Sequence, residues 1–231
     1  MTALPQGLTA GTWNIDATHS TIGFVVRHGG ISKARGKFDV IAGSATVGDS
    51  FESLSVTATA DPKTINTGND QRDEHLKSGD FFKADEHPEI VFTSTSVEDF
   101  DGSDFTLKGE VTLLGVTKEV VFDAEFLGAS EDPYGNQVAG VSATAKINRK
   151  DFGMSFDATM PGGDLLVSNN VTLEIDVELT KAKANQGTVQ QRHTAGAVQV
   201  NCGDRSLQPT FLASTCQWGT CKATQTLVCS R

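Results

Sequence analysis

The first 181 residues contain no cysteine, which excludes a disulfide, a thiol nucleophile and a cysteine-ligated metal from that part of the chain. No apolar run approaches the ~20 residues that a membrane-spanning helix needs. The first eleven residues, MTALPQGLTAG, lack the basic start and the apolar core of a secretory signal. We therefore expect no integral membrane segment and a cytoplasmic location, or a periplasmic or secreted one if a leader has been removed.

Basic residues are scarce in the same part of the chain. Residues 1–180 hold 28 Asp and Glu against 13 Lys and Arg, whereas residues 181–231 hold one acid against six bases. An acidic balance argues against nucleic-acid binding and against docking of the whole body on an anionic membrane by charge. The change in charge near Lys181 predicts a body of residues 1–181 and a tail of residues 182–231.

The tail is rich in Gln, Thr and Ser and shows neither a helical nor a strand period. We expect it to be disordered or loosely attached, because such a composition buries too little apolar surface to offset the entropy of ordering. Removal of the chain after Lys183 should then leave the melting temperature of the body unchanged. The alternative is a small disulfide-tied module that uses Cys202, Cys216, Cys221 and Cys229.

Strand patterns dominate the body. Val171, Leu173, Ile175, Val177 and Leu179 alternate with polar residues, which predicts a strand with one buried face. Further strands are predicted at residues 21–28, 36–40, 44–47, 54–60, 89–96, 105–113, 120–126 and 141–147. Single glycines at 23, 109 and 140 interrupt good strands and suit the bends of a closed sheet. The fold class is therefore all-β, and an eight-stranded antiparallel barrel is favoured over a sandwich.

One short helix is predicted at residues 71–78. Asn69 and Asp70 are able to cap its start, and Gly79 is expected to end it in the left-handed conformation. A helix of about two turns with Leu76 as its sole apolar anchor is not stable alone. We expect it to cap the barrel, with Phe81 and Phe82 turned inward, and to gate the uptake of a ligand.

The body holds twelve of the thirteen phenylalanines, but its aromatic residues with a polar group are limited to Trp13 and Tyr134. Such hydrocarbon-like aromatic content suits a dry cavity. It equally suits an ordinary barrel core, and composition alone leaves both interpretations open.

Metal and catalytic patterns are weak. The histidines at 19, 28, 75 and 87 lack the spacing that sets two rings toward one metal ion, so we expect no metal site. No serine lies in a nucleophile elbow, so no nucleophilic enzyme is expected. The alternative hypothesis is an enzyme that acts on a small polar substrate at the barrel mouth through Asp16, His19 and Arg72. A salt bridge from Arg72 to a nearby carboxylate is the competing structural role for that residue.

Several segments in order resemble the YceI-like family of lipid-binding proteins. The likeness rests on Trp13–Asp16 with His19-Ser20, and on Phe24–His28 followed by Gly36–Phe38. The strongest likeness is in residues 66–94, and Gly109–Lys118 and Arg149–Gly153 also match. It covers about residues 11–181 and does not reach the tail.

The resemblance implies an extended lipocalin-like barrel that carries a long apolar ligand without catalysis. The ligand would be an isoprenoid quinone, a polyprenyl chain or a fatty-acyl tail, and no other cofactor is implied. Family members are associated with transport and stress responses and often form homodimers. The expected ligand-binding residues are Phe24, Phe38, Arg72, His75, Leu76, Phe81, Phe82, Phe92, Leu107, Leu113, Phe122 and Phe156.

Overall fold

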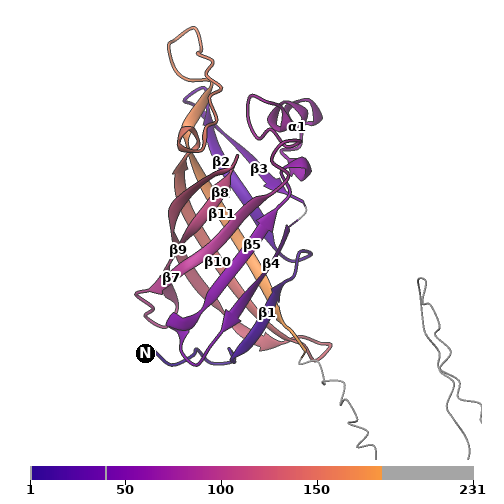
Figure 1. Cartoon of the computed structure of the whole chain (residues 1–231), viewed down its shortest axis with the longest axis vertical. Coiled ribbons are helices and arrows are strands. Elements are labelled where there is room, and N and C mark those ends of the chain that lie inside the picture. Colours follow the sequence, from indigo (N-terminus) through magenta and orange to yellow (C-terminus); the bar gives the residue numbers. More distant parts are fainter. Residues whose placement is uncertain (1, 40, 184–231) are drawn as a thin grey trace, which may run out of the picture. The chain divides into compact units, whose positions relative to one another are not determined.

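The computed structural model describes residues 2–39 and 41–183. Apart from its first two residues, the predicted tail lies outside the described residues. Within them the chain folds into one continuous antiparallel sheet with a single α-helix at one end (Figure 1). No helix of this part is long and apolar enough to cross a membrane.

The described residues form eleven strand segments, the helix α1 (Asp70–Lys77) and three short 3₁₀ turns. The strands are β1 (Gly11–Ile15), β2 (Thr21–His28), β3 (Ser32–Phe38), β4 (Ile41–Val47), β5 (Ser55–Ala60), β6 (Ile65–Asn66), β7 (Ile90–Glu98), β8 (Asp104–Leu113), β9 (Val116–Glu131), β10 (Gln137–Asn148) and β11 (Val167–Lys181). The 3₁₀ turns are η1 (Phe51–Ser53), η2 (Pro62–Thr64) and η3 (Arg149–Phe152).

These segments close into an eight-stranded barrel, because three of its strands are interrupted: β1 continues as β2, β3 as β4, and β5 as β6. β1 and β2 follow one another along the same edge of β11, and β3 and β4 pair with β2 and β1 in turn. Ile15 pairs with Leu179, and Thr21 pairs with Asp176. Five residues lie between Ile15 and Thr21, whereas two lie between Asp176 and Leu179. The three extra residues form a loop at this β1–β2 junction. β4 continues the ring through β5, β7, β8, β9 and β10 back to β11.

The predicted all-β eight-stranded barrel is confirmed, and the differences lie at the strand ends. β9 and β10 extend well beyond their predicted alternation. Their outer ends continue past the barrel core, where the inner face no longer has to be apolar. β1 and β6 were not predicted as strands, because each is too short to show a period.

The helix forms one residue earlier than predicted, and its ending differs. The side chain of Asn69 caps the start by accepting from the backbone N–H of Arg72 at 2.9 Å. The prediction of a left-handed Gly79 is wrong. The chain leaves α1 through Ser78 in an extended conformation, and the Ser78 hydroxyl donates to the carbonyl of His75 at 2.7 Å. The Ser78 hydroxyl thus satisfies the carbonyl of His75, one of the carbonyls left free at the end of the helix. Where a left-handed glycine ends a helix, backbone N–H groups satisfy such carbonyls instead.

The barrel end away from α1 is closed by a group of aromatic side chains, which we call the aromatic plug: Trp13, Phe51, Phe100, Phe105 and Phe126. Trp13 and Phe51 are almost fully buried, at 0% and 1% exposure. The rings of Phe51 and Phe100 stack with centroids 3.8 Å apart, and Phe105 meets Phe51 edge-on at 5.0 Å. The α1 end instead carries the β2–β3 turn and a hairpin of residues 158–166 (Figure 1).

Candidate functional site

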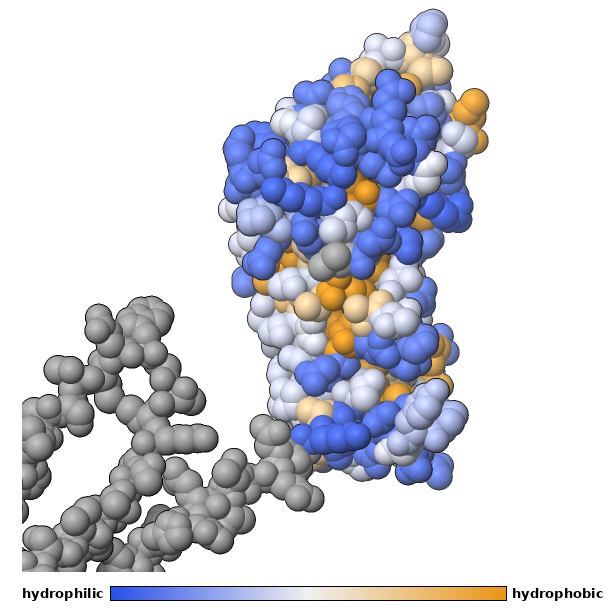
Figure 2. Space-filling view, turned by 90° about the vertical axis from the view of Figure 1, so that its right-hand side faces the viewer, coloured by the Kyte–Doolittle hydropathy of each residue, from blue (hydrophilic) through white to orange (hydrophobic). Residues whose placement is uncertain are grey.

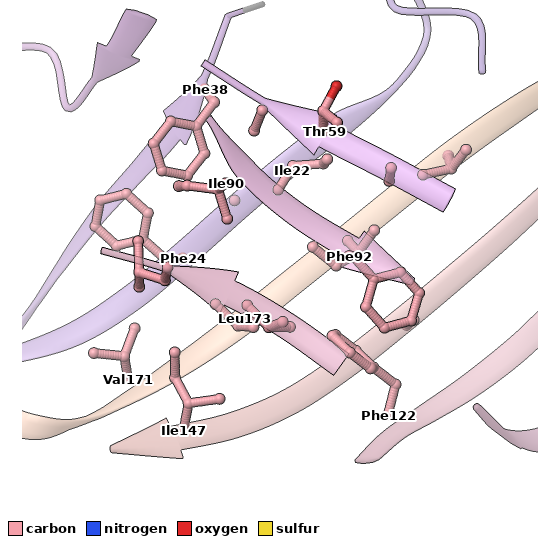
Figure 3. A pocket seen from close by; sticks show the side chains of 18 of the residues that line it. Ile22, Phe24, Phe38, Thr59, Ile90, Phe92, Phe122, Ile147, Val171 and Leu173 are labelled. Atoms are coloured by element: carbon pink, nitrogen blue, oxygen red, sulfur yellow. The ribbon is translucent and has the colours of Figure 1, made fainter. Parts of the chain in front are cut away.

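The barrel encloses a cavity of about 250 Å³, slightly below the ~300–1,000 Å³ typical of small-molecule sites. It arises because alternate residues of each strand face inward, as Val171, Leu173 and Ile175 do on β11. Thirty-three residues line the cavity, and Thr59 and Arg149 are the ones among them with polar side chains. Figure 3 shows phenylalanine, isoleucine and valine side chains from facing strands converging on this space.

Nine of the twelve residues expected to bind a ligand line the cavity. They are Phe24, Phe38, Leu76, Phe81, Phe82, Phe92, Leu107, Leu113 and Phe122. Phe156 lies behind this layer, with its ring 4.9 Å from that of Phe81 and 5.3 Å from that of His75. Arg72 and His75 do not line the cavity either. His75 bonds to Asp80 at 2.8 Å.

Sequence reasoning missed a further group of lining residues. It includes Ile22, Val26, Ile90, Ile147, Val171, Leu173, Ile175 and Val177. The signal that identifies them was available, because on β11 the alternation had already assigned one face to the interior. The expected set favours phenylalanine and omits the aliphatic residues on the inner faces of β2, β10 and β11.

Two phenylalanine rings lie flat against the barrel wall over glycines. A β-carbon at Gly36 would lie 2.4 Å from Cζ of Phe24, and one at Gly109 would lie 2.3 Å from Cε2 of Phe92. Contacts this short exclude any side chain at these positions while the rings stay in place. These glycines therefore let the two rings lie close against the wall where they line the cavity. Gly109 also lies at a register shift with β7, in keeping with the bend expected there.

Helix α1 is held beside the cavity by polar contacts to Thr67, at the end of β6. Arg72 donates from Nε to the Thr67 hydroxyl and from Nη2 to the Thr67 carbonyl, both at 2.7 Å. Asp73 is buried at 8% exposure and accepts from the Thr67 N–H at 3.0 Å and from its hydroxyl. The alternative role of Arg72, a salt bridge to a carboxylate, is not seen among the described residues, where Thr67, Arg72 and Asp73 form a hydrogen-bonded clasp.

Arg149 supplies the charged group among the lining residues. It is 3% exposed and donates to the carbonyls of Met154, Val167 and Ser168 at 3.1–3.3 Å. Its Nη2 also meets Asp157 at 3.3 Å. A buried guanidinium with its donors spent on the backbone and one carboxylate fixes the chain around residues 154–168 at this end of the barrel.

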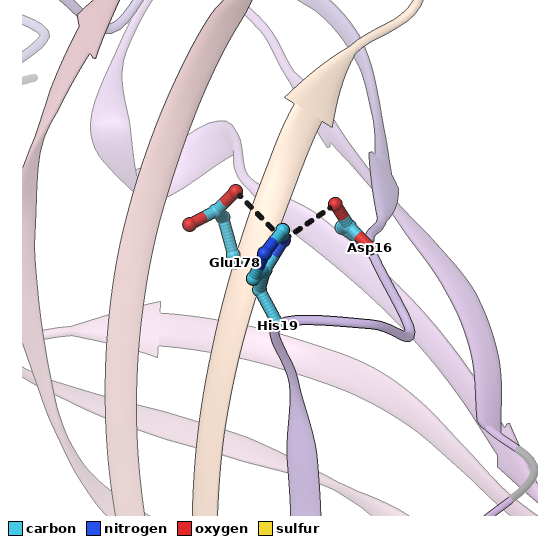
Figure 4. Close-up of side chains that lie close together, drawn as sticks. All are labelled: Asp16, His19 and Glu178. Carbon is cyan, nitrogen blue, oxygen red and sulfur yellow. Dashed lines mark hydrogen bonds and ion pairs between the residues drawn. The ribbon is translucent and has the colours of Figure 1, made fainter. Parts of the chain in front are cut away.

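The residues of the enzyme hypothesis are not brought together at the mouth. Asp16 and His19 lie at the β1–β2 junction, and none of Asp16, His19 and Arg72 lines the cavity. His19 Nδ1 lies 3.0 Å from Asp16 Oδ2 and 3.6 Å from Glu178 Oε1 on β11 (Figure 4). These three groups also offer ligand atoms within 4.8 Å of one another. Sequence reasoning missed Glu178, because nothing in the spacing connects it to His19.

The contacts at the β1–β2 junction shift the pKa values of His19 and Asp16. The hydrogen bond with Asp16 raises the pKa of His19 above its ordinary 6.5, and the charges of Asp16 and Glu178 add to the effect. The same bond, with the N–H of Thr18, lowers the pKa of Asp16 below 3.8. A protonated His19 between two carboxylates therefore joins the β1–β2 junction to β11.

We expect the contribution of His19 to stability to depend on pH. Because its folded pKa is raised, the contribution is complete below the unfolded pKa of about 6.5 and is lost as pH rises through the folded pKa. The melting temperature of His19→Gln should thus fall below that of the unaltered protein at acidic pH, and the gap should narrow at alkaline pH. His28→Gln, which replaces an exposed histidine without an ion pair in the described residues, is the control. A gap that is constant with pH contradicts the assignment.

A closed eight-stranded antiparallel barrel with an apolar cavity is the architecture of lipocalin-like barrels. The family model described as YceI-like domain matches residues 13–179. The UPF0312 protein SAS2572 of Staphylococcus aureus strain MSSA476 is 39% identical over 171 residues, which cover 73% of this chain and 96% of that protein. The protein SAUSA300_2620 of strain USA300 is 38% identical over the same coverage. The chain belongs to the YceI-like family.

Solved structures agree on the fold. The Campylobacter jejuni YceI protein is 29% identical with a TM-score of 0.59, covering 66% of this chain and 88% of that one. BcnA of Burkholderia cenocepacia is 15% identical with a TM-score of 0.61, covering 71% and 98%. A polyisoprenoid binding domain from Saccharophagus degradans is 16% identical with a TM-score of 0.55, covering 75% and 100%.

Proposed function

We propose that the protein binds and carries one long apolar tail, of the isoprenoid or fatty-acyl type, inside the barrel. The observation that carries this proposal is the cavity itself, in which hydrocarbon side chains line a space of about 250 Å³. A space of this kind offers a polar substrate few partners, whereas each buried CH₂ of a tail contributes roughly 0.8 kcal/mol. The polyisoprenoid binding domain of Saccharophagus degradans has the same fold and supports the choice of ligand class.

Ligand access is proposed on the side of the barrel that carries α1. Figure 2 shows a hollow on this side, in which apolar side chains are visible between hydrophilic ones. Leu76 of α1 and the adjacent Phe81 and Phe82 line the cavity. The opposite end is filled by the aromatic plug. A tail would therefore enter beside α1 and extend toward the plug.

Native mass spectrometry of protein purified from cells, followed by organic extraction, tests the function directly. We expect a bound mass that disappears on extraction, and we expect the extracted protein to take up farnesol or oleamide. The bound molecule, once identified, separates the isoprenoid class from the fatty-acyl class. A clean ligand-free mass together with no uptake of either probe would refute the proposal.

The gating role of α1 is tested by Leu76→Ala. Leu76 is only partly buried, so the loss of folding free energy should be about 1–2 kcal/mol, below the range for fully buried leucines. The off-rate of bound oleamide should rise more than its on-rate, because α1 is held mainly by the Thr67 clasp once Leu76 is truncated. Gln71→Ala, on the exposed side of the same helix, is the control. An unchanged off-rate in folded Leu76→Ala would show that ligands pass elsewhere.

A further inference from the structure

The β2–β3 hairpin carries a positive charge and has no acidic residue of its own. Residues 17–38 contain Arg27, Lys33, Arg35 and Lys37 and no Asp or Glu, although residues 1–180 have 28 acids against 13 bases. All four basic side chains are exposed. The expectation that net charge keeps this protein off anionic membranes therefore does not extend to this hairpin.

These charges face one another rather than acidic partners. The strand register places Arg27 directly opposite Lys33, and like charges in opposed positions destabilise a strand pair. The ion pair that the described residues show for this hairpin joins Lys37 to Asp39 at 3.0 Å. Within the part of the chain that the structure describes, Arg27 donates to the carbonyl of Gly30 at 3.5 Å. A local conflict of this kind is typical of a surface that meets an anionic partner.

The tip of the same hairpin is apolar. Ile31 is 89% exposed at the β2–β3 turn, and Met160 is 37% exposed at the turn of the 158–166 hairpin. The two turns lie side by side, because the Gly29 N–H donates to the Leu166 carbonyl at 2.9 Å. A β-carbon on Gly29 would lie 3.7 Å from the Met160 methyl group. Figure 1 shows both turns together at the α1 end of the barrel.

The segment of residues 154–168, which packs against the β2–β3 turn, carries two acidic groups, Asp157 and Asp164. Asp157 is neutralised by Arg149 at 3.3 Å and Lys150 at 2.5 Å. Asp164 is the carboxylate beside the turn, with Oδ2 3.3 Å from the β-carbon position of Gly30. Arg27, Lys33 and Arg35 therefore outweigh it.

We propose that the β2–β3 end of the barrel docks on an anionic lipid bilayer. Arg27, Lys33 and Arg35 lie over the phospholipid headgroups, and Ile31 and Met160 enter the interface between headgroups and acyl chains. Val26 and Val167, which both line the cavity, lie next to the same turn, because Val167 pairs with His28 and Val26 is two residues before His28 on β2. Docking thus brings the cavity next to the phase in which a long apolar molecule dissolves.

This inference goes beyond the proposed function and is tested separately from it, because vesicle binding is measured with extracted, ligand-free protein. The probe is a phosphatidylcholine vesicle that contains phosphatidylglycerol, with pure phosphatidylcholine as the reference, in a flotation assay at low salt. We expect the full chain to prefer the anionic vesicles. Each basic residue near such a surface contributes about fivefold in affinity, so Arg27→Gln/Lys33→Gln/Arg35→Gln should weaken binding about 100-fold.

Two matched controls separate the hairpin from net charge and from general hydrophobicity. Lys118→Gln/Lys146→Gln/Lys183→Gln makes the same charge change at exposed positions elsewhere and should bind nearly as the unaltered protein does. Ile31→Ser should weaken binding, whereas Val121→Ser, at a 46% exposed position on the barrel wall, should not. Circular dichroism verifies that each variant is folded.

Three results overturn the inference: no preference for anionic vesicles, equal losses in the two triple variants, or full binding by Arg27→Gln/Lys33→Gln/Arg35→Gln. The last result would assign membrane binding to another part of the chain, the basic residues 182–231 included. Self-association of the hairpin end would instead appear as a larger particle in sedimentation without vesicles, and it too would contradict the docking of a bilayer.

Discussion

Ala143→Phe should abolish most ligand binding while the barrel stays folded. Ala143 lines the cavity on β10, between Ile175 of β11 and Ala124 of β9. A phenyl ring at this position occupies space that a tail would use. Exclusion of three or four CH₂ groups costs about 2.5–3 kcal/mol, which is roughly a 100-fold loss of affinity. Isothermal titration of extracted protein with oleamide measures this loss.

Thr144→Phe is the control for that substitution. Thr144 is the next residue on β10, and its side chain is exposed on the outer face. It therefore receives a phenyl ring without any change in the cavity, and its affinity should match that of the unaltered protein. If Ala143→Phe is folded and binds oleamide as tightly as Thr144→Phe does, the ligand does not occupy the barrel interior.

Phe51→Ala should cause the largest loss of stability, about 3–5 kcal/mol. Phe51 is 1% exposed and lies at the centre of the aromatic plug, stacked on Phe100 and edge-on to Phe105. Truncation removes these contacts and leaves a cavity that neighbouring strands of a closed barrel are poorly placed to fill. Urea unfolding with a two-state analysis measures the difference.

Phe156→Ala provides a comparison within the same residue type. Phe156 is partly buried and packs on Phe81 and His75 near α1, outside the plug. Its truncation should cost clearly less than that of Phe51. Similar costs for both variants would show that the plug is not the main support of that barrel end.

Much of the fold could be predicted because each barrel strand alternates apolar and polar residues, and this alternation is visible within a few neighbouring residues. Alternation along Val171–Leu179 and its counterparts identifies the inner face without any knowledge of pairing. The β1–β2 junction could not be predicted, because its three extra residues become visible only against the register of β11. The contact of His19 with Glu178 depends on the same register.

The hydrogen bonds that hold α1 also could not be predicted from the sequence pattern. Leu76, Phe81 and Phe82 were expected to hold the helix, and their side chains do face the cavity. The buried carboxylate of Asp73 was not anticipated, because an acid in the first turn of a helix is ordinarily explained by the helix dipole. Its partner Thr67 precedes the helix by too few residues to suggest a tertiary contact, yet the turn folds back and makes one.

The aromatic plug limits the length of the apolar tail that the barrel would shelter. In the proposed binding mode, a flexible tail that enters beside α1 would stop where Trp13 and Phe51 fill the interior, so the protein would set the sheltered length. Tails shorter than this depth leave apolar wall uncovered, and each unit beyond it remains in water and adds nothing. Affinity across a homologous series of chain lengths should therefore rise and then level off. The length at which it levels reports the distance from the access side to the plug.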